Sequence, residues 1–300
     1  MVRLGNARSD ENIKGWLFFL PFAALASVFF FIPLIGALLL SFREYSLLDG
    51  SPFSAGRWIG IQNYVTAFGD PTFLRALWNT CLYTGITVPA KLIISLALAL
   101  ICNAKIVKAK GFFRTVYYIP TITSSVAISI IFLYLFKADG LINMVLAKFG
   151  VAEIAWFYDP KVALPIIMLM ATWAAVGFYM VIFLAGLQSI DPTLYEAAMI
   201  DGASEWQQFL NVTLPCLKPT IFFNLVVAMI GSFNIFDFAY IISGGLGGPA
   251  DSTMTIVLYL YQTGFSYLKM GYASSIAFIL FAIILALTFV QKQFFKEDAE

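Results

Sequence analysis

The stretch WLFFLPFAALASVFFFIPLIGALLLSF, from Trp16 to Phe42, contains 27 consecutive residues without a formal charge. A helix needs about 20 apolar residues to cross the roughly 30 Å hydrocarbon core of a bilayer. The stretch is too long for the apolar core of a signal peptide, and no small-residue cleavage site follows it. It therefore predicts a retained membrane-spanning helix.

The composition of the whole chain also indicates a membrane protein. Its 300 residues are 61% hydrophobic and 12% charged, whereas soluble domains carry about 25% charged residues. The net charge of +1 gives no reason to expect binding to nucleic acid. The absence of histidine excludes Ser-His-Asp and Cys-His catalysis and the usual zinc hydrolase sites. Cys81, Cys102 and Cys216 are widely separated, so the sequence predicts neither a disulfide framework nor a metal site.

Five more apolar stretches follow the first, and together they predict an all-α, polytopic integral membrane protein with about six transmembrane helices. The predicted spans are residues 16–42, 76–102, 115–136, 163–187, 220–243 and 272–290. Basic residues gather in three short segments, at Arg3, Arg8 and Lys14, at Lys105, Lys108, Lys110 and Arg114, and at Lys292 and Lys296. The positive-inside rule places these segments in the cytoplasm of a protein of the cell membrane. The chain is thus predicted to have a cytoplasmic segment 1–15, a transmembrane domain 16–290 and a cytoplasmic tail 291–300.

This topology also places a polar segment, residues 188–219, in the cytoplasm between the fourth and fifth spans. Its central part reads DPTLYEAAMIDGASEWQQFLNVTLP. Asp191 and the proline after it are typical of a helix start, and Gly202 suits the left-handed residue at a helix end. Ser204 and Gln207 have the spacing of a capping box, which predicts a second helix. The segment is therefore predicted to be helix, glycine turn, helix.

Pro215 and Pro219 are predicted to end the second of these helices before the fifth span begins. The small side chains of Ala197 and Ala198, close to Gly202, would let another protein approach the backbone closely. Residue types alone do not distinguish this from an ordinary amphipathic connector between two spans.

The sequence EAAMIDGA, followed by Leu214-Pro215, resembles the EAA motif of ABC importer permeases. In that family the helix-turn-helix docks in a cleft of the cytoplasmic ATPase and transmits its closure to the spans. The resemblance implies that Glu196 pairs with a basic residue of the ATPase and that Gly202 sets the angle between the helices. The coupling residues it implies are Glu196, Ala197, Ala198, Asp201, Gly202, Leu214 and Pro215.

Four longer stretches resemble the carbohydrate class of these permeases, the maltose and glycerol-3-phosphate type. They are WIGIQNYVTAFGDPTFLRALWNT (58–80), FRTVYYIP (113–120), LAGLQSIDPTLYEAAMIDGA (184–203) and GGLGGPADSTMTIVLYLYQTGFSYLKMGYASS (244–275). The glycine-proline loop and the aromatic stretch after it are features of the sugar class. The resemblance implies two ATP-binding subunits, a second and related permease, an external solute-binding protein and a sugar substrate.

The loop GGLGGP, residues 244–249, is not a phosphate-binding loop, because no Gly-Lys pair occurs anywhere in the chain. The chain is therefore predicted not to be an enzyme, with no cofactor of its own and with ATP and magnesium bound by the partner ATPases. By the same resemblance, Gly244, Gly245, Gly248 and Pro249 would dock the solute-binding protein; a plain tight turn is the alternative.

Polar and aromatic side chains within the spans are candidates for sugar binding. They are Asn234, Asp237, Trp173, Tyr179, Tyr259 and Gln262. Asn234 and Asp237 would share one face of a continuous fifth span, either toward sugar or in a structural hydrogen bond. The aromatic residues also suit membrane anchoring. Lys91 has two interpretations, contact with an anionic substrate group or with a carboxylate on a neighbouring chain.

Together these features predict a permease subunit of a binding-protein-dependent ABC importer that moves a sugar or oligosaccharide by alternating access. Six spans make half a pathway, and the resemblance favours a heterodimer with a related chain, although the sequence also allows a homodimer. One alternative is an importer of another organic solute such as glycerol-3-phosphate. Another is an ion-coupled secondary transporter, but no clear repeat relates the two halves. A membrane-embedded enzyme would need a cluster of His, Asp or Glu that the spans lack.

Overall fold

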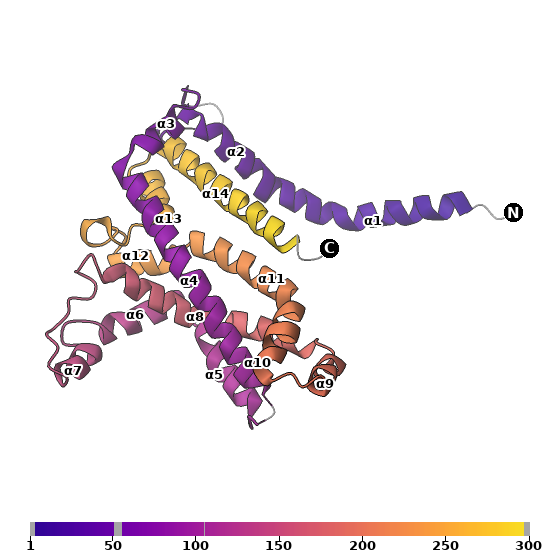
Figure 1. The fold of residues 1–300 in the computed structure, drawn as a ribbon. Coiled ribbons are helices and arrows are strands. Elements are labelled where there is room, and N and C mark those ends of the chain that lie inside the picture. The colour runs from indigo at the N-terminus through magenta and orange to yellow at the C-terminus, as the bar shows by residue number, and fades with distance from the viewer. Residues whose placement is uncertain (1–3, 51–55, 105, 297–300) are drawn as a thin grey trace. The chain divides into compact units, whose positions relative to one another are not determined.

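The computed structural model describes residues 4–50, 56–104 and 106–296, with side chains described from Lys14 to Phe295 (Figure 1). Arg3 and Lys105 of the basic segments lie outside the described residues, as do the side chains of Arg8 and Lys296. The described chain is helical apart from loops and one pair of two-residue strands. It forms two compact units, residues 1–68 with 263–278, and residues 69–262 with 279–300.

The first unit contains a long apolar helical segment and a small sheet. Its helices are α1 (Leu4–Ala26), α2 (Ile32–Ser41), α3 (Gln62–Gly69) and the start of α14 (Met270–Lys296), with a π-helical turn at Ser27–Phe31 between the first two. The strands β1 (Arg43–Glu44) and β2 (Arg57–Trp58) pair antiparallel. Buried Asn63 holds the start of this sheet, because its Nδ2 donates to the carbonyl oxygens of Ser41 and Arg43, both at 2.9 Å.

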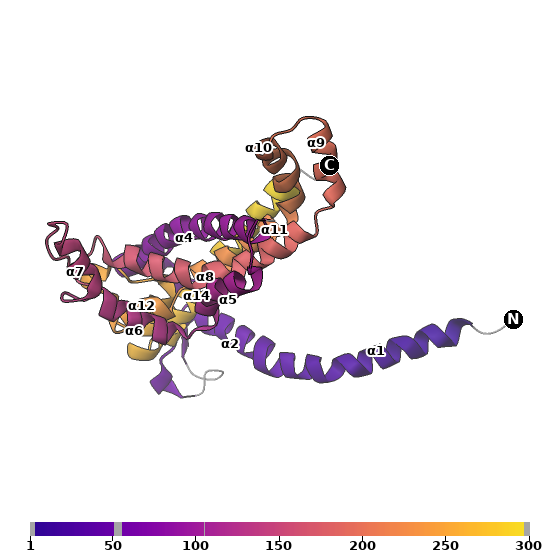
Figure 2. The same cartoon turned by 90° about the horizontal axis from the view of Figure 1, so that it is seen from below.

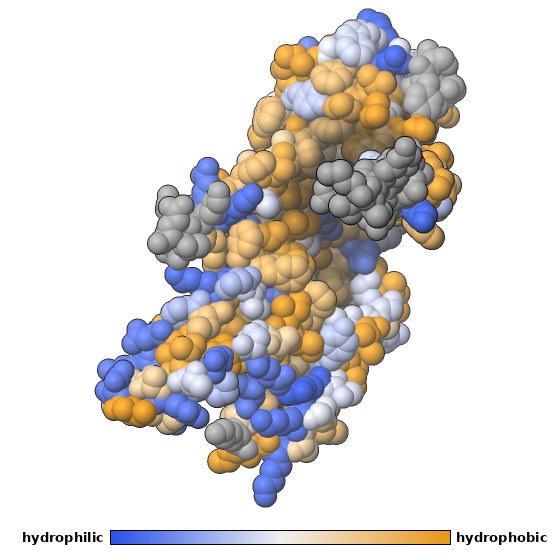
Figure 3. Space-filling view, turned by 90° about the vertical axis from the view of Figure 1, so that its right-hand side faces the viewer, coloured by the Kyte–Doolittle hydropathy of each residue, from blue (hydrophilic) through white to orange (hydrophobic). Residues whose placement is uncertain are grey.

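The second unit is a helical bundle whose most buried member is α8 (Figures 1 and 2). Its helices are α4 (Pro71–Asn103), α5 (Lys110–Ile122), α6 (Ser125–Leu135), α7 (Leu141–Ala147), α8 (Ala163–Gln188), α9 (Pro192–Ile200), α10 (Glu205–Gln208), α11 (Leu214–Phe233), α12 (Asp237–Ser243), α13 (Ile256–Tyr261) and the rest of α14. Helices α4, α5, α6, α11 and α12 all contact α8. Apolar side chains cover much of the face in Figure 3, as expected of helices that face lipid.

Within the described residues, five helical segments are long and apolar enough to cross a membrane, or six if the bent pair α5 and α6 counts as one span. The predicted span at 115–136 is not one straight helix in the structure, because the chain bends by 95° between α5 and α6. Pro120 lies in the last turn of α5, and Thr123 is extended. The Ser124 side chain accepts the Val126 N–H at 3.3 Å and so starts a new helix.

The fifth predicted span is also interrupted. Helix α11 ends at Phe233, residues 234–236 are not helical, and α12 begins at Asp237. The prediction that Asn234 and Asp237 share one face of a continuous helix is therefore wrong. Breaks of this kind leave backbone groups unpaired, and within a membrane they are tolerated where the chain is buried in protein or lines a cavity.

Helices α5 and α8 approach each other very closely at Gly177. A Cβ atom added to this glycine would lie 2.1 Å from the carbonyl oxygen of Tyr117 and 2.9 Å from the Cα of Tyr118. Contact at this point is therefore between backbone and backbone, and no side chain fits there.

A buried amide ties the loop before α13 to α4. The Nδ2 of Asn79 donates to the carbonyl oxygens of Asp251 and Met254, at 2.7 and 2.9 Å. The neighbouring Thr80 hydroxyl accepts the Ile256 N–H at 2.9 Å. These bonds satisfy carbonyls and an amide that would otherwise be buried without partners.

We expect Asn79→Asp to lower the free energy of unfolding by about 2–3 kcal/mol, because a carboxylate would face two carbonyl oxygens in a buried site. Thermal unfolding of the detergent-purified chain measures the change. Asn234→Asp is the matched control, because Asn234 is exposed and its amide bonds only the Ile230 carbonyl of its own helix. Equal melting temperatures for the two variants would show that the hydrogen bonds of Asn79 do not stabilise the fold.

Candidate functional site

The segment between α8 and α11 has the predicted helix-turn-helix structure. Asp191 caps α9, accepting the Thr193 N–H at 2.9 Å, and this bond lowers the pKa of its carboxyl. Gly202 has φ +77°. The helix ends in a Schellman motif, in which the Gly202 N–H donates to the Met199 carbonyl and the next residue's N–H donates to the Ala198 carbonyl. Ser204 and the residue three positions on form the predicted capping box that starts α10. These local predictions are confirmed.

The end of the second helix differs from the prediction. Pro215 and Pro219 do not stop it; after α10 a π-helical turn, Phe209–Thr213, leads directly into α11. Pro215 lies at the start of α11, just after this π turn, and Pro219 lies inside α11. Helical structure therefore continues from Glu205 to Phe233, across the predicted boundary between residues 219 and 220.

The outer surface of this segment carries apolar side chains that no other described residue covers. Leu194, Met199, Ile200 and Trp206 are exposed, and Ile200 is 87% accessible. Of the residues predicted to couple to an ATPase, Glu196, Ala197, Asp201, Gly202 and Pro215 are exposed, while Ala198 and Leu214 are half-buried. The exposed surface thus combines small and apolar groups with the carboxylates of Glu196 and Asp201, a composition suited to a protein interface.

The inner surface of the segment is joined to the spans. Tyr195 of α9 hydrogen-bonds the Thr213 hydroxyl at 2.9 Å, which links the two halves of the helix-turn-helix. Tyr195 and Val212 pack on a buried cluster contributed by α4, α8 and α11, which includes Phe183 and Leu217. A displacement of α9 would therefore act directly on the ends of three helices.

A cavity of about 340 Å³ lies where the breaks after α5 and α11 face α4 and α8. Its polar and aromatic lining includes Tyr83, Lys91, Thr121, Ser125, Phe178 and Tyr179. Hydroxyl groups, aromatic rings and one cation around a space of this size are suited to a polar organic molecule.

The structure brings only some of the predicted sugar-binding residues to this cavity. Tyr179 lines it, and Asp237 lies beside it, accepting a hydrogen bond at 3.0 Å from the Ser125 hydroxyl that does line it. Asn234 is not in the lining, and Trp173 packs against Phe132, with ring centroids 5.8 Å apart.

Tyr259 and Gln262 are also away from the cavity, and both are buried. The hydroxyl of Tyr259 donates to Asp70, and the Gln262 amide donates to the carbonyl oxygen of Gly245. For both residues these contacts favour the packing interpretation over sugar binding.

The sequence-based prediction missed Tyr83 and Phe178, and it left open whether Lys91 contacts an anionic substrate group or a carboxylate of a neighbouring chain. Tyr83 and Lys91 are eight residues apart on α4, a spacing that places them on one helix face. A search for polar residues at helical spacing on the second span would have found them together.

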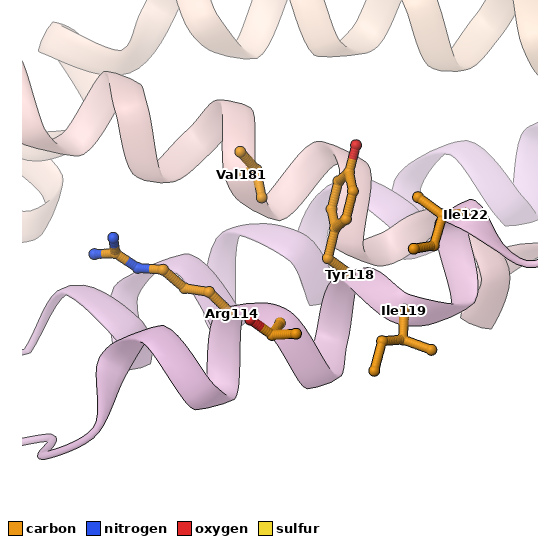
Figure 4. Close-up of a pocket in the computed structure, with 6 residues that line it drawn as sticks. Arg114, Tyr118, Ile119, Ile122 and Val181 are labelled. Atoms are coloured by element: carbon orange, nitrogen blue, oxygen red, sulfur yellow. The ribbon is translucent and has the colours of Figure 1, made fainter.

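A second cavity, of about 300 Å³, lies along α5 and α8 (Figure 4). Its lining is mostly apolar, with Tyr118, Ile119, Ile122 and Val181 around it and Arg114 at one end. It lacks the converging hydroxyl groups of the first cavity, so the first is the better candidate for a polar solute.

The predicted docking loop is held in a defined shape. Gly244, Gly245, Gly247 and Gly248 all have positive φ, between +62° and +84°. The Gly247 N–H donates to the Ser243 hydroxyl at 3.1 Å, and the Gly247 carbonyl accepts the Thr253 N–H at 2.9 Å. Leu246, between them, is 76% exposed. The loop therefore presents an apolar side chain on an ordered turn, which suits its predicted docking role.

Comparison with known proteins agrees with this architecture. The chain is 36% identical over 283 residues to the lactose transport system permease protein LacF of Rhizobium radiobacter, covering 93% of each chain. It is also 36% identical over 283 residues to the arabinooligosaccharides transport system permease protein AraP of Bacillus subtilis (strain 168), covering 94% of this chain and 88% of that one. A bacterial ABC transporter involved in the import of the acidic polysaccharide alginate has a similar structure, with TM-score 0.78, 25% identity and coverage of 97% and 99%.

A family model also matches most of the sequence. The model described as "Binding-protein-dependent transport system inner membrane component" matches residues 53–296. The predicted resemblance to importer permeases of the carbohydrate class and the predicted all-α, multi-pass membrane fold are confirmed. The chain belongs to the family of binding-protein-dependent transport system inner membrane components.

Proposed function

We propose that this chain is a permease subunit of an ABC importer and carries a sugar or oligosaccharide across the membrane. Its similarity to LacF and AraP, which are named for lactose and arabinooligosaccharides, supports the substrate class. Two ATP-binding subunits, a second and related permease, and an external solute-binding protein complete the transporter. ATP and magnesium bind to the ATPase subunits, and residues 1–15, the segment around α9 and the C-terminal tail lie on their side of the membrane.

The observation that carries this proposal is the exposed surface of α9 and α10. Leu194, Met199, Ile200 and Trp206 are exposed apolar side chains in a polar and well-capped segment that also exposes the carboxylate of Glu196. An ATPase that covers this surface would bury the apolar side chains, and a basic residue on it would pair with Glu196. Because Tyr195 and Val212 pack on the ends of three helices, closure of the ATPases would be transmitted to those helices.

Transport then follows from alternating access. ATP binding would favour an outward-facing state, in which the solute-binding protein releases its cargo into the cavity beside the breaks in α5–α6 and α11–α12. Hydrolysis would return the inward-facing state and release the cargo into the cytoplasm. Each partner drives the change only to the extent that it binds one state more tightly than the other.

Affinity purification of the tagged chain from its native membrane tests the proposal. We expect mass spectrometry to find a Walker-motif ATPase and a second permease with the wild-type chain. Glu196→Lys should lose the ATPase, because a lysine would meet a basic residue and lose the ion pair. Glu153→Lys makes the same change of charge at an exposed loop residue outside the helix-turn-helix. This control should still purify with the ATPase.

A wild-type chain that purifies without any ATPase would contradict the proposal and would favour an ion-coupled secondary transporter. Equal recovery of the ATPase with Glu196→Lys and with wild type would contradict the role given to Glu196.

A further inference from the structure

Lys91 lies near the middle of α4 and is almost completely buried, at 5% exposure. Its side chain is part of the lining of the 340 Å³ cavity. A buried ammonium within a membrane-spanning helix is costly, and such groups face a cavity or a bundle interior and mark functional sites.

The described surroundings of Lys91 do not balance its charge. The Nζ donates to the Ser232 hydroxyl at 3.0 Å and lies 5.6 Å from the centre of the Tyr83 ring. Among the residues that the structure describes, no carboxylate lies within the 4.0 Å of an ion pair with Nζ; the two ion pairs found, Arg57–Glu44 and Lys137–Asp139, are elsewhere. An ammonium has three donors, and the structure shows one of them used.

The nearest intramembrane carboxylate is already engaged. Asp237 accepts the hydroxyl of Ser125 and is itself exposed. The other polar side chains of the cavity carry neutral hydroxyls and belong to Tyr83, Thr121, Thr123, Ser125 and Tyr179. The cavity therefore presents a positive charge together with hydroxyl groups and the ring of Phe178.

We propose that Lys91 is an anion-binding subsite and that the cargo is a saccharide bearing an acidic group, such as a carboxylate, sulfonate or phosphate ester. The inference rests on the proposed function and narrows its substrate class. Lys91 would bind the acidic group, while Tyr83, Phe178 and Tyr179 would contact the faces and hydroxyls of the sugar ring. The positive charge would then be neutralised each time cargo enters the cavity.

Uptake by the whole transporter, purified with its ATPases, second permease and solute-binding protein and placed in liposomes, tests the subsite. The probes are matched pairs that differ in the acidic group: digalacturonate and digalactose, sulfoquinovosyl glycerol and glucosyl glycerol, and glucose 6-phosphate and glucose. We expect an acidic member to be taken up, and its neutral counterpart to be taken up at less than about a tenth of that rate. Lys91→Met should lower uptake of the acidic member about 10- to 100-fold, the range expected for one lost charge-assisted hydrogen bond.

Two variants separate charge from packing. Lys91→Arg keeps the charge and should retain more uptake than Lys91→Met. Thr87→Val is the matched control, because the Thr87 hydroxyl also approaches Ser232, at 3.4 Å, yet is outside the cavity lining. It should transport at close to the wild-type rate.

Uptake of neutral saccharides only, or full uptake of the acidic probe by Lys91→Met, would overturn the subsite and leave the proposed function standing. Loss of the second permease from the purified Lys91→Met complex would also overturn it, because Lys91 would then pair with a carboxylate of that chain. If the wild-type transporter carried no saccharide of either kind, the proposed function itself would fail.

Discussion

Replacing Gly202 with proline is expected to abolish uptake while the chain remains in the membrane with its spans folded. Gly202 has φ +77°, and its N–H donates to the Met199 carbonyl at 3.1 Å. Proline holds φ near −65° and has no N–H, so it can neither adopt this turn nor make this bond. The path of the chain from α9 to α10 would change, and with it the surface proposed to meet the ATPase. Uptake of labelled sugar by cells, together with the amount of chain in the membrane, measures the effect.

A pair of alanine variants shows whether uptake depends on the place of Gly202 in the helix-turn-helix or only on backbone strain from a positive φ. Gly202→Ala and Gly150→Ala each place an L-residue at nearly the same φ, +77° and +75°, and neither added Cβ meets another atom within 4 Å. Each should cost about 1–2 kcal/mol of local stability. Only Gly202→Ala should reduce uptake markedly, because Gly150 follows α7 and lies outside the helix-turn-helix. Normal uptake by Gly202→Pro would show that this turn does not transmit ATPase closure.

Gly177→Leu is expected to prevent the second unit from folding stably. Because a Cβ atom at this position would lie 2.1 Å from a carbonyl oxygen of α5, the two backbones would have to separate, and the packing of α5 on α8 would be lost with them. Overpacking commonly costs about 1–3 kcal/mol where side chains can move. Here the opposing atoms are backbone, so we expect a loss of at least about 3 kcal/mol.

The yield of monodisperse protein in detergent and its thermal unfolding measure this loss. Gly85→Leu is the control, because Gly85 is also a helical glycine of a long apolar helix, yet an added Cβ there meets nothing within 4 Å. Equal yields and melting temperatures for the two variants would show that α5 and α8 do not pack as described.

Much of the architecture follows from local rules that act within one stretch of chain. Apolar runs long enough to cross a bilayer predicted the spans, and the N-caps Asp191 and Ser204 predicted the starts of α9 and α10. The breaks at Thr123 and Asn234 were not predicted, because apolar residues continue on both sides of each. What favours a break there is tertiary: the interrupted backbone borders a cavity that forms only when several helices assemble.

For the candidate binding residues too, local sequence suggested residue types, and tertiary contacts decided which of them line the cavity. Residue type suggested Tyr179, which lines the cavity, since an aromatic hydroxyl in a span suits a sugar site, but it suggested Tyr259 and Gln262 equally well. Those two bind Asp70 and a loop carbonyl, contacts between residues far apart in the chain that no short-range pattern announces. Lys91 was noticed as unusual, but only the packing of α4 against α8 and α11 shows that it borders a cavity.

The π-helical turn at Phe209–Thr213 has a consequence for how the outer surface of α10 is aimed. An α-helix advances about 100° around its axis with each residue. A π turn, with hydrogen bonds between residues five apart, accommodates an extra residue without breaking the helix. The number of residues in this turn therefore sets the angle about the helix axis between Trp206 and the faces of α11. Adding or removing one residue there would leave both helices intact and swing the surface of α10 away from any partner shaped to receive it.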